Sequence, residues 1–328
     1  MLIAGDIGGT KTALAIFSSE AGPLVPLAQT KVHSADYPSL QVIVKEFLAA
    51  EMKPVERACF AVAGPVINGR VKTTNLPWVI EESSLAEQLN INRQSVHLLN
   101  DLEAIANAVP ILRPSDVVTI NAGQPVAKGT IAVIAPGTGL GESFLTWDGS
   151  GYRPHSSEGG HADFAPTNER QIRLLEHMLK KSDHVSFEHV CSGIGIPNIY
   201  SFLRDIEQLP QTPEVTSLID SAPDRTAAIF THADHSELCA ATIEVFVSIL
   251  AAEASNLAVK MMATGGVYVA GGVAVHALAA LKQPAFMESF TRKGRFAELM
   301  SRIPIHVVVS PAGLAGAAAY GLKKPNSD

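Results

Sequence analysis

The sequence predicts an α/β protein made of two similar units around a cleft. The chain has 328 residues, more than the ~250–300 at which one hydrophobic core usually stops growing, so two domains are expected. A strand, a glycine-rich turn and a second strand occur at the N-terminus and again near residue 137. Segments with helical spacing follow the strands in both halves, which is typical of layered α/β units. Clefts between such units commonly bind ligands.

The composition is that of an ordinary globular protein, with 47% apolar and 17% charged residues. The 25 basic and 32 acidic side chains give a net charge of −7, which argues against a nucleic-acid partner. The three cysteines, Cys59, Cys191 and Cys239, are far apart and form no CxxC pair, so neither a zinc knuckle nor a disulfide scaffold is expected. This cysteine usage favours a reducing compartment.

We expect no signal peptide, no membrane segment and no membrane partner. The N-terminus meets an acid at Asp6 and lacks the basic start and long apolar stretch of a signal peptide. The uncharged stretch 264–281 contains two glycine pairs, which predict turns around a buried strand instead of a membrane helix. The expected location is therefore cytoplasmic.

The elements expected in the first half follow from apolar runs, helical spacing and turn residues. A short apolar run before Asp6 and a second run after Lys11 predict a hairpin with a glycine-rich turn. Asn68-Gly69 predicts a type I′ turn, because these residues tolerate its two positive φ angles. Strands are expected at 2–5, 12–17, 27–32, 57–63 and 96–99, and helices at 39–48, 83–89 and 101–108.

The second half repeats this pattern and ends in a helix. An apolar strand at 130–135 precedes a glycine-rich loop, and another strand follows the loop. An alanine-rich segment predicts a closing helix at 313–322. The other expected strands are 117–120, 143–147, 267–270 and 305–309, and the other helices lie at 172–180 and over most of 194–260.

The first motif that carries chemistry is Asp6-Ile7-Gly8-Gly9-Thr10-Lys11. A strand that ends near Asp6 places a carboxylate at the mouth of a cleft, where it would hold magnesium through water. Gly8 and Gly9 let backbone N–H groups turn toward an anion, and Thr10 adds a hydroxyl donor. Taken alone, an acidic β-turn without a ligand explains this motif equally well.

The second motif, Gly137-Thr138-Gly139-Leu140-Gly141, follows an apolar strand and predicts a backbone cradle for phosphate. It is not a Walker A loop, since the Lys-Ser/Thr ending is missing, and not a Rossmann fingerprint, since a strand follows it. A tight hairpin is the alternative. Two such loops, each opening one half of the chain, favour the phosphate-binding interpretation.

Asn100 and Asp101 lie where a predicted strand ends and a helix begins. Asp101 would either cap this helix or face the ligand cleft, because strand ends in α/β units point toward it. A kinase that phosphorylates a hydroxyl needs one carboxylate to accept the proton during transfer. Asp101 is the best-placed residue for this role.

Two further motifs contain paired glycines. Glu158-Gly159-Gly160-His161 is expected to be a loop, and its carboxylate and imidazole suit the paired hydroxyls of a sugar. Metal ligation or a solvated loop are the alternatives. Gly271-Gly272 follows an apolar strand and would let adenine or ribose approach the backbone, although ordinary strand–helix packing explains the same pattern.

Together and in this order, the five motifs resemble the sugar-kinase branch of the actin-like ATPase superfamily, and within it the bacterial glucokinase family. The resemblance covers essentially the whole chain. Beyond the glycine turns it rests on TNLPW (74–78), LND (99–101), EGGHADFAP (158–166), HVSFE (184–188) with Ser192-Gly193, and KGRF (293–296). The EGGHADFAP segment together with the Asn-Asp pair is specific.

The resemblance implies two duplicated ribonuclease-H-like domains of the actin-like ATPase type, hinged around a cleft that closes on the sugar. The smaller domain would comprise residues 1–110 and 312–328, and the larger one residues 111–311. A homodimer is a further expectation from the resemblance.

The resemblance also implies roles for individual residues. Asp101 would be the base that acts on the sugar 6-hydroxyl, and Asp6 would bind magnesium. The sugar-binding residues would be Asn75, Asn100, Asp101, Glu158, His161 and Glu188. The phosphates and adenosine of ATP would be bound by Asp6, Gly8, Gly9, Thr10, Gly137, Thr138, Gly139, Gly271 and Gly272. Related sugar kinases carry a cysteine-rich zinc motif after their histidine, whereas this chain has only Cys191 there, so we expect ATP and Mg²⁺ but no zinc.

The implied function is an ATP-dependent glucokinase, which converts glucose and ATP to glucose 6-phosphate and ADP at the entry to glycolysis. A kinase for another hexose or an amino sugar is an alternative, because sequence alone does not fix how hydroxyl-binding residues distinguish epimers. A non-catalytic sugar- or ATP-binding regulator on the same fold is the second alternative. The presence of Asp101 favours catalysis.

Overall fold

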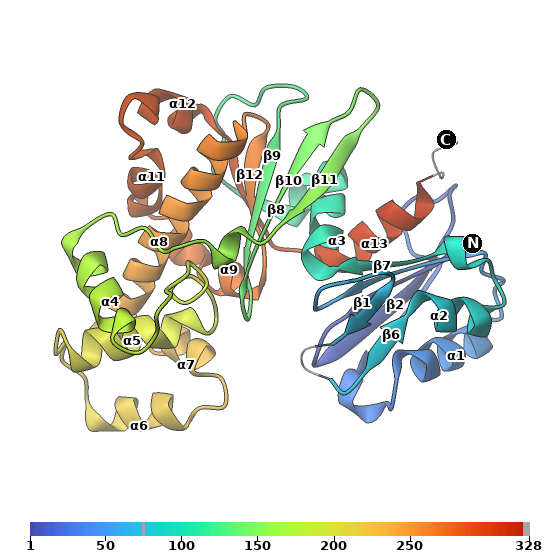
Figure 1. Cartoon of the computed structure of the whole chain (residues 1–328), viewed down its shortest axis with the longest axis horizontal. Helices are drawn as coiled ribbons and strands as arrows, with labels where there is room; N and C mark the ends of the chain where they lie inside the picture. Colours follow the sequence, from blue (N-terminus) through green and yellow to red (C-terminus); the bar gives the residue numbers. More distant parts are fainter. Residues whose placement is uncertain (74–75, 324–328) are drawn as a thin grey trace. The chain divides into compact units, whose positions relative to one another are not determined.

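The computed structural model of the chain describes residues 1–73 and 76–323. These residues form two compact units, each of which is described by itself (Figure 1). Unit 1 comprises Met1–Leu112 and Ser310–Asp328, and unit 2 comprises Arg113–Val309.

Unit 1 contains a five-stranded sheet in the order β3-β2-β1-β4-β7. Strand β2 is antiparallel to both β1 and β3, whereas β1, β4 and β7 run parallel. The hairpin predicted at the N-terminus is confirmed, since Ile7 pairs with Thr12 across its glycine-rich turn. The strands are β1 (Leu2–Ile7), β2 (Lys11–Phe17), β3 (Ala28–His33), β4 (Arg57–Val62) and β7 (Val96–Asn100).

Helices cover both faces of this sheet (Figure 1). Ile3 and Ile7 of β1 belong to the hydrophobic cluster that includes α1 and α2, whereas Leu2 and Ala4 pack with α3 and α13. This alternation is the period of two of a β-strand, and it explains why β1 is apolar on both sides. The helices are α1 (Leu40–Glu51), α2 (Glu82–Leu89), α3 (Asp101–Ala108) and α13 (Ala312–Leu322).

A small hairpin in unit 1 confirms the predicted type I′ turn. Asn68 and Gly69 have φ angles of 51° and 70°. Ile67 and Arg70 exchange backbone hydrogen bonds of 2.9 and 3.0 Å. Two short strands, β5 (Arg70–Lys72) and β6 (Val79–Glu81), pair beside this turn.

Unit 2 contains a six-stranded sheet in the order β11-β10-β9-β12-β13-β8. Strand β10 is antiparallel to both β9 and β11, whereas β9, β12 and β13 run parallel. The first five positions therefore repeat the strand order and directions of the unit 1 sheet. The strands are β8 (Val117–Asn121), β9 (Ile131–Pro136), β10 (Leu140–Trp147), β11 (Tyr152–Ser157), β12 (Gly266–Val269) and β13 (Ile305–Val308).

The core of unit 2 surrounds the long helix α8 (Glu237–Met261), which lies against the sheet (Figure 1). Among the described helices, α8 alone has the length and apolar character to cross a membrane. However, 83% of its most apolar stretch is buried inside the structure, as expected for a core helix. The other helices are α4 (Glu169–Leu179), α5 (Gly195–Asp205), α6 (Pro213–Ser221), α7 (Arg225–Thr231), α9 (Gly272–His276), α10 (Leu278–Leu281), α11 (Pro284–Thr291) and α12 (Ala297–Arg302).

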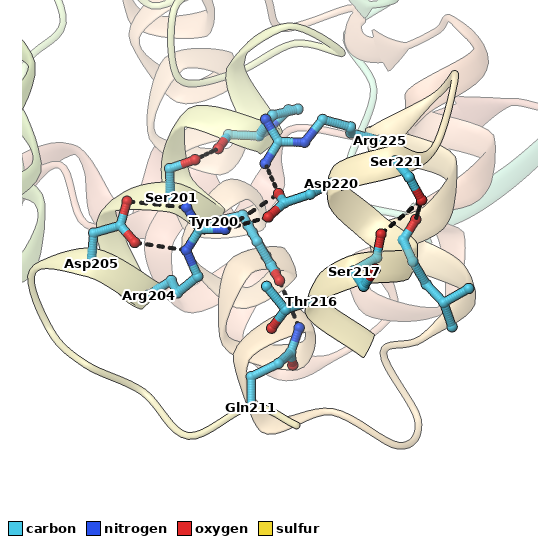
Figure 2. A network of polar contacts seen from close by, with 12 residues as sticks. Tyr200, Ser201, Arg204, Asp205, Gln211, Thr216, Ser217, Asp220, Ser221 and Arg225 are labelled. Carbon is cyan, nitrogen blue, oxygen red and sulfur yellow. Dashed lines mark hydrogen bonds and ion pairs between the residues drawn. The ribbon is translucent and has the colours of Figure 1, made fainter. Parts of the chain in front are cut away.

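A polar network ties three of these helices together, as Figure 2 shows. Asp220 of α6 accepts hydrogen bonds from Arg204 of α5 and from Arg225 of α7, both at 3.0 Å. Arg204 also pairs with Asp205 at 2.6 Å. Exposed ion pairs contribute little when isolated, but a shared carboxylate fixes the relative positions of three helix ends.

Prediction and structure differ mainly in short elements. Strands β6 and β11 and helices α10 to α12 were not predicted. The segment Gly159–His161, expected to be a loop, forms a 3-10 turn. The other predicted strands and helices are confirmed, with bounds that shift by a few residues.

Candidate active site

The turn between β1 and β2 is held by hydrogen bonds within unit 1. The Gly8 N–H donates to the Lys11 carbonyl at 3.0 Å, and the Ser34 hydroxyl donates to the Gly8 carbonyl at 2.8 Å. The Ser34 N–H in turn donates to the Thr10 carbonyl at 3.0 Å. The loop from Gly8 to Thr10 is therefore fixed beside Asp6.

Asp6 is a half-buried carboxyl with a second carboxyl, Asp101, nearby. Burial, reinforced by the charge of Asp101 and opposed by Lys31, raises the pKa of Asp6 to about 6. A carboxyl with this pKa is still ~90% ionised at neutral pH. Two carboxylates of like charge suit a hard cation such as Mg²⁺, which prefers oxygen ligands.

The surroundings of Asp6 fit magnesium bound largely through water. In the part of the chain that the structure describes, no three His, Cys, Asp or Glu side chains cluster as a ready metal cage. A Cβ on Gly313 of α13 would lie 2.6 Å from Asp6 Oδ2, so the helix approaches this carboxylate as closely as glycine allows. Mg²⁺ would therefore combine Asp6 with water and phosphate oxygens, as it commonly does in kinases.

Asn100, not Asp101, is the N-cap of α3. Asn100 Oδ1 accepts a hydrogen bond from the Leu102 N–H at 2.9 Å, and its Nδ2 donates to the Gly64 carbonyl at 3.0 Å. Asp101 Oδ1 also accepts from the Leu102 N–H, at 3.0 Å, but its side chain remains exposed. The protein around it nevertheless displaces enough water to raise the pKa of Asp101.

The loop of Gly137, Thr138 and Gly139 closes the hairpin between β9 and β10. The Gly137 N–H donates to the Gly139 carbonyl at 2.9 Å, and the Gly193 N–H donates to the Gly137 carbonyl at 2.8 Å. The Ile194 N–H donates to the Thr138 carbonyl at 3.2 Å. A Cβ on Gly137 would meet no atom within 4 Å, so one side of this fixed loop is open.

The glycine pair after β12 lies against the same loop. Gly271 has a φ of 89°, a backbone conformation that favours glycine, and a Cβ there would lie 2.5 Å from the Pro136 carbonyl oxygen. A Cβ on Gly272 would meet no atom within 4 Å. Two of the three glycine-rich segments predicted to bind ATP are thus neighbours in unit 2.

Glu158, His161 and Glu188 form one cluster in unit 2. His161 Nε2 lies 3.9 Å from Glu158 Oε2, and His161 Nδ1 lies 3.9 Å from Glu188 Oε1. The Glu188 N–H donates to the Gly160 carbonyl at 2.9 Å, which holds the two segments together. The side chains of Glu158 and His161 are 86% and 61% exposed, so both are available to a ligand.

Glu188 also joins this cluster to the Gly137–Gly139 loop. Its Oε2 accepts a hydrogen bond from the Leu140 N–H at 2.9 Å. A Cβ on Gly139 would overlap the same oxygen, so this carboxylate packs directly on the loop. The Glu188 side chain, which is 20% exposed, thus contacts both the predicted sugar-binding segment and the predicted phosphate-binding segment.

The predicted site residues form one set in unit 1 and one set in unit 2, and one of them lies outside the described residues. In unit 1, Asp6 and Asp101 are neighbours, with Gly8, Gly9, Thr10 and Asn100 around them. In unit 2, Gly139 packs against Glu188, and Pro136, directly before the loop, packs against Gly271. Glu158 and His161 lie beside Glu188. Asn75 lies outside the described residues.

Several supporting residues were not predicted from the sequence. Ser34 holds the Gly8 loop, and Lys31 faces Asp6. Thr226 of α7 donates its hydroxyl to the Gly193 carbonyl at 2.5 Å and thereby supports the residue that bonds to Gly137. None of these residues belongs to a motif, and only the fold brings them to the loops.

Comparison with known proteins identifies the family. A sequence model of the glucokinase family matches residues 3–324. The glucokinase of Nostoc punctiforme is 39% identical over 335 residues, which cover 97% of this chain and 98% of that protein. The glucokinase of Yersinia enterocolitica is 33% identical over 97% of this chain and 95% of that protein.

Solved structures give the same result. The crystal structure of a glucokinase from an Antarctic psychrotroph matches with a TM-score of 0.84 and 31% identity, over 97% of this chain and 98% of that chain. A ROK family glucokinase from Streptomyces griseus, solved with glucose and AMPPNP, shares the fold, with a TM-score of 0.64 and 19% identity over 97% of this chain and 98% of that chain. The mixed α/β fold is thus that of sugar kinases, and the chain belongs to the glucokinase family.

Proposed function

We propose that this chain is an ATP-dependent glucokinase, which transfers the γ-phosphate of ATP to the 6-hydroxyl of glucose at the entry to glycolysis. Membership of the family supports this reaction, since relatives at up to 39% identity carry the name glucokinase. We further propose that the two units are duplicated ribonuclease-H-like domains, spanning 1–110 with 312–328 and 111–311, hinged around a cleft. The repeated five-strand order in the two sheets supports the duplication.

The observation that carries the catalytic assignment is that Asp101 is exposed and is not the N-cap of α3. Asn100 caps α3, so Asp101 is not needed as the cap and presents an exposed carboxylate beside Asp6. In the proposed reaction Asp101 accepts the proton of the glucose 6-hydroxyl as that oxygen attacks the γ-phosphorus. Burial raises the pKa of Asp101, which makes its carboxylate a stronger base.

Backbone N–H groups would bind the phosphates of ATP. The proposed phosphate-binding loops are Gly8 to Thr10 in unit 1 and Gly137 to Gly139 in unit 2. Since the N–H groups of Gly8 and Gly137 close their own turns, the proposed donors are those of Gly9, Thr10, Thr138 and Gly139. Gly271 and Gly272 would admit the adenosine, because Gly272 faces open space. Asp6 would hold Mg²⁺, which when bound neutralises charge on the transferring phosphate.

The sugar would be held by carboxylate, imidazole and amide groups. Glu158, His161 and Glu188 offer acceptors and a donor within one cluster, and Asn100 keeps one amide N–H beyond its bond to Gly64. Asn75 is proposed for the same role from the family resemblance. Directional hydrogen bonds to specific hydroxyls are the means by which such a site would select among hexoses.

Three further features remain our predictions. We expect a cytoplasmic homodimer, from the family resemblance. We expect no zinc, since each of the three cysteines is buried and unpaired and none has the spacing of a zinc motif. We expect neither a nucleic-acid nor a membrane partner, in keeping with the net charge of −7 and a buried α8.

The test is a coupled assay for sugar 6-phosphate formation with Mg-ATP. Glucose, mannose, fructose, galactose and N-acetylmannosamine are compared in parallel, and turnover on glucose is expected. Asp101→Asn should lower kcat by ~10²–10⁴-fold while leaving sugar binding largely intact. Glu87→Gln, the same chemical change at an exposed position of unit 1, is the control.

Each contrary outcome has a defined meaning. Turnover on a different sugar would replace glucose by that hexose or amino sugar. ATP binding without turnover on any sugar would identify a non-catalytic regulator. Near-normal kcat in Asp101→Asn would remove Asp101 from the role of base.

A further inference from the structure

Two carboxyl groups that the proposed reaction does not use meet in the core of unit 2. Glu142 lies on β10 and is 2% exposed, and Glu253 lies on α8 and is 0% exposed. Burial of ionised carboxylates is costly unless each is paired with a positive charge or hydrogen-bonded. The hydrogen bonds and charges around these two carboxyl groups therefore indicate whether they carry a proton.

The contacts of the two carboxyls leave one oxygen of each without a donor. Glu253 Oε2 accepts a hydrogen bond from Asn256 Nδ2 at 2.8 Å. Glu142 Oε1 and Glu253 Oε1 are both buried, and no residue that the structure describes donates a hydrogen bond to either oxygen. Each carboxyl instead affects the pKa of the other through a side-chain hydrogen bond between them. Two ionised carboxylates are acceptors only, so a direct bond between them requires one proton.

The charged and titratable groups around the pair do not replace this proton. Lys293 donates to Asn256 Oδ1 at 2.7 Å and to the Ala252 carbonyl at 3.4 Å, and its charge opposes the rise in the pKa of Glu253 without reversing it. Lys260 contributes a favourable charge at longer range, and the Cys191 thiol, whose pKa is raised by burial, stays neutral. Burial raises the pKa of Glu142 to about 8 and raises that of Glu253 as well.

Glu142 also touches the turn that carries two proposed sugar-binding residues. A Cβ on Gly159 would overlap Glu142 Oε2, so the backbone of the turn rests directly on this carboxyl. The Ala162 N–H donates to the Gly159 carbonyl at 2.9 Å, and the His161 N–H donates to the Glu158 carbonyl at 3.0 Å. A displacement of Glu142 toward Gly159 would therefore move the 3-10 turn.

We propose that Glu142 and Glu253 share one proton at neutral pH and that this protonated pair positions the Gly159–His161 turn for sugar binding. Its role in sugar binding rests on the proposed function, whereas the shared proton does not. Loss of the proton to solvent at alkaline pH would leave two negative charges in contact. Their repulsion would push Glu142 against Gly159, where there is no free space, and disturb Glu158 and His161.

The shared proton is tested by infrared spectroscopy of the ligand-free protein. A protonated carboxylic acid has a carbonyl absorption distinct from that of a carboxylate. The difference between the infrared spectra of the wild type and Glu142→Gln at about pH 7 should contain this absorption. The absorption should be lost by about pH 9.5. Glu244→Gln changes an exposed carboxylate of the same helix α8 and should leave the absorption in place.

The positioning role is tested by hydrogen exchange and by kinetics. In wild type, amides of the 158–162 turn should lose protection relative to Glu142→Gln as the pH rises from about 7 to about 9.5, with both proteins compared at each pH. Over the same range the KM for glucose should rise by ~5-fold or more in wild type and stay within ~2-fold in Glu142→Gln, with kcat affected less. Hydrogen exchange needs no ligand and reports on the turn even if the protein acts on no sugar.

A second variant covers the case in which Glu142→Gln does not fold. In Glu253→Gln the amide oxygen can accept from Asn256 and the amide nitrogen can donate to Glu142, so the same contacts form without the shared proton. It should behave as Glu142→Gln does. Absence of the protonated absorption at pH 7 would overturn the shared proton, and equal protection of the turn in wild type and variant at both pH values would overturn the positioning role.

Discussion

Asp6 shows how a single residue position links the fold to the proposed chemistry. Asp6 lies near the end of β1, and Gly313 of α13 packs against its carboxylate. Asp101 adds a second negative charge nearby. Burying like charges together is unfavourable in the absence of a counter-ion. The simplest function for such an arrangement is to bind a cation.

Replacing Asp6 with Asn should therefore weaken the response to magnesium. The Mg²⁺ concentration that gives half the maximal rate is expected to rise by ~10–100-fold, because a neutral amide is a poorer partner than a carboxylate for the ion and its waters. The measurement is a magnesium titration of the initial rate at fixed ATP. Asp36→Asn, at a carboxylate that is 72% exposed in the same unit, is the control. An unchanged magnesium response in Asp6→Asn would exclude Asp6 from the metal site.

Sequence predicts the glycine-rich turns well because their conformation depends on the local backbone. Gly8 and Gly137 were predicted because a glycine-rich turn between two apolar strands is visible in adjacent letters. Ser34 and Thr226 were not predicted, since each supports its loop from a distant segment through one hydroxyl. From sequence, Glu142 is simply a polar residue next to a predicted strand, and its partner Glu253 lies more than a hundred residues away.

At the scale of elements, α7 supports the proposed phosphate-binding loop. Thr226, in the first turn of α7, bonds to the Gly193 carbonyl, and the Gly193 N–H bonds to the Gly137 carbonyl. The helix is in turn tied to α5 and α6 by the Asp220 network (Figure 2). The position of the loop thus depends on packing well beyond its own hairpin.

Thr226→Val should loosen this loop while conserving side-chain shape. Loss of one buried hydrogen bond costs about 1–3 kcal/mol, of which only part would reach the loop, so the KM for ATP is expected to rise by ~3–10-fold. The KM for glucose should change less, which separates this effect from general destabilisation. Thr231→Val is the matched control, since that exposed hydroxyl donates within its own helix, to the Ala227 carbonyl. An ATP KM equal to that of the control would show that α7 does not support the loop.

The elements that sequence reasoning missed have weak local signals. Strand β11 is half exposed, contains Pro154 and lies at the edge of its sheet, where a missing N–H is tolerated. Its strand character comes from pairing with β10, which the letters of the segment do not reveal. By contrast, β9 and β1 up to Gly5 are continuous apolar runs because helices or other layers cover both faces, and such runs are readily recognised.

At the scale of the whole molecule, each unit has its own hydrophobic core, and the proposed site residues belong to both units. One large cluster fills unit 2, and two clusters lie on the two faces of the unit 1 sheet. Asp101 and Asn100 belong to unit 1, whereas Glu158, His161 and Glu188 belong to unit 2. The residues themselves indicated only two strand–turn–strand patterns, and the duplicated domains were expected from the resemblance, because strand order depends on crossovers between segments far apart in sequence.

This division makes a prediction about thermal unfolding. With separate cores, the ligand-free protein is expected to show two calorimetric transitions. If residues of both units bind glucose, saturating glucose should raise both transitions, since a ligand at 100 times its Kd stabilises the folded state by about 2.7 kcal/mol. For units of this size that corresponds to ~5 °C or more. L-glucose, which has the same composition but the opposite handedness, should shift neither. A shift of the unit 2 transition alone would assign sugar binding to Glu158, His161 and Glu188, and would leave Asp101 without contact to the sugar until ATP binds.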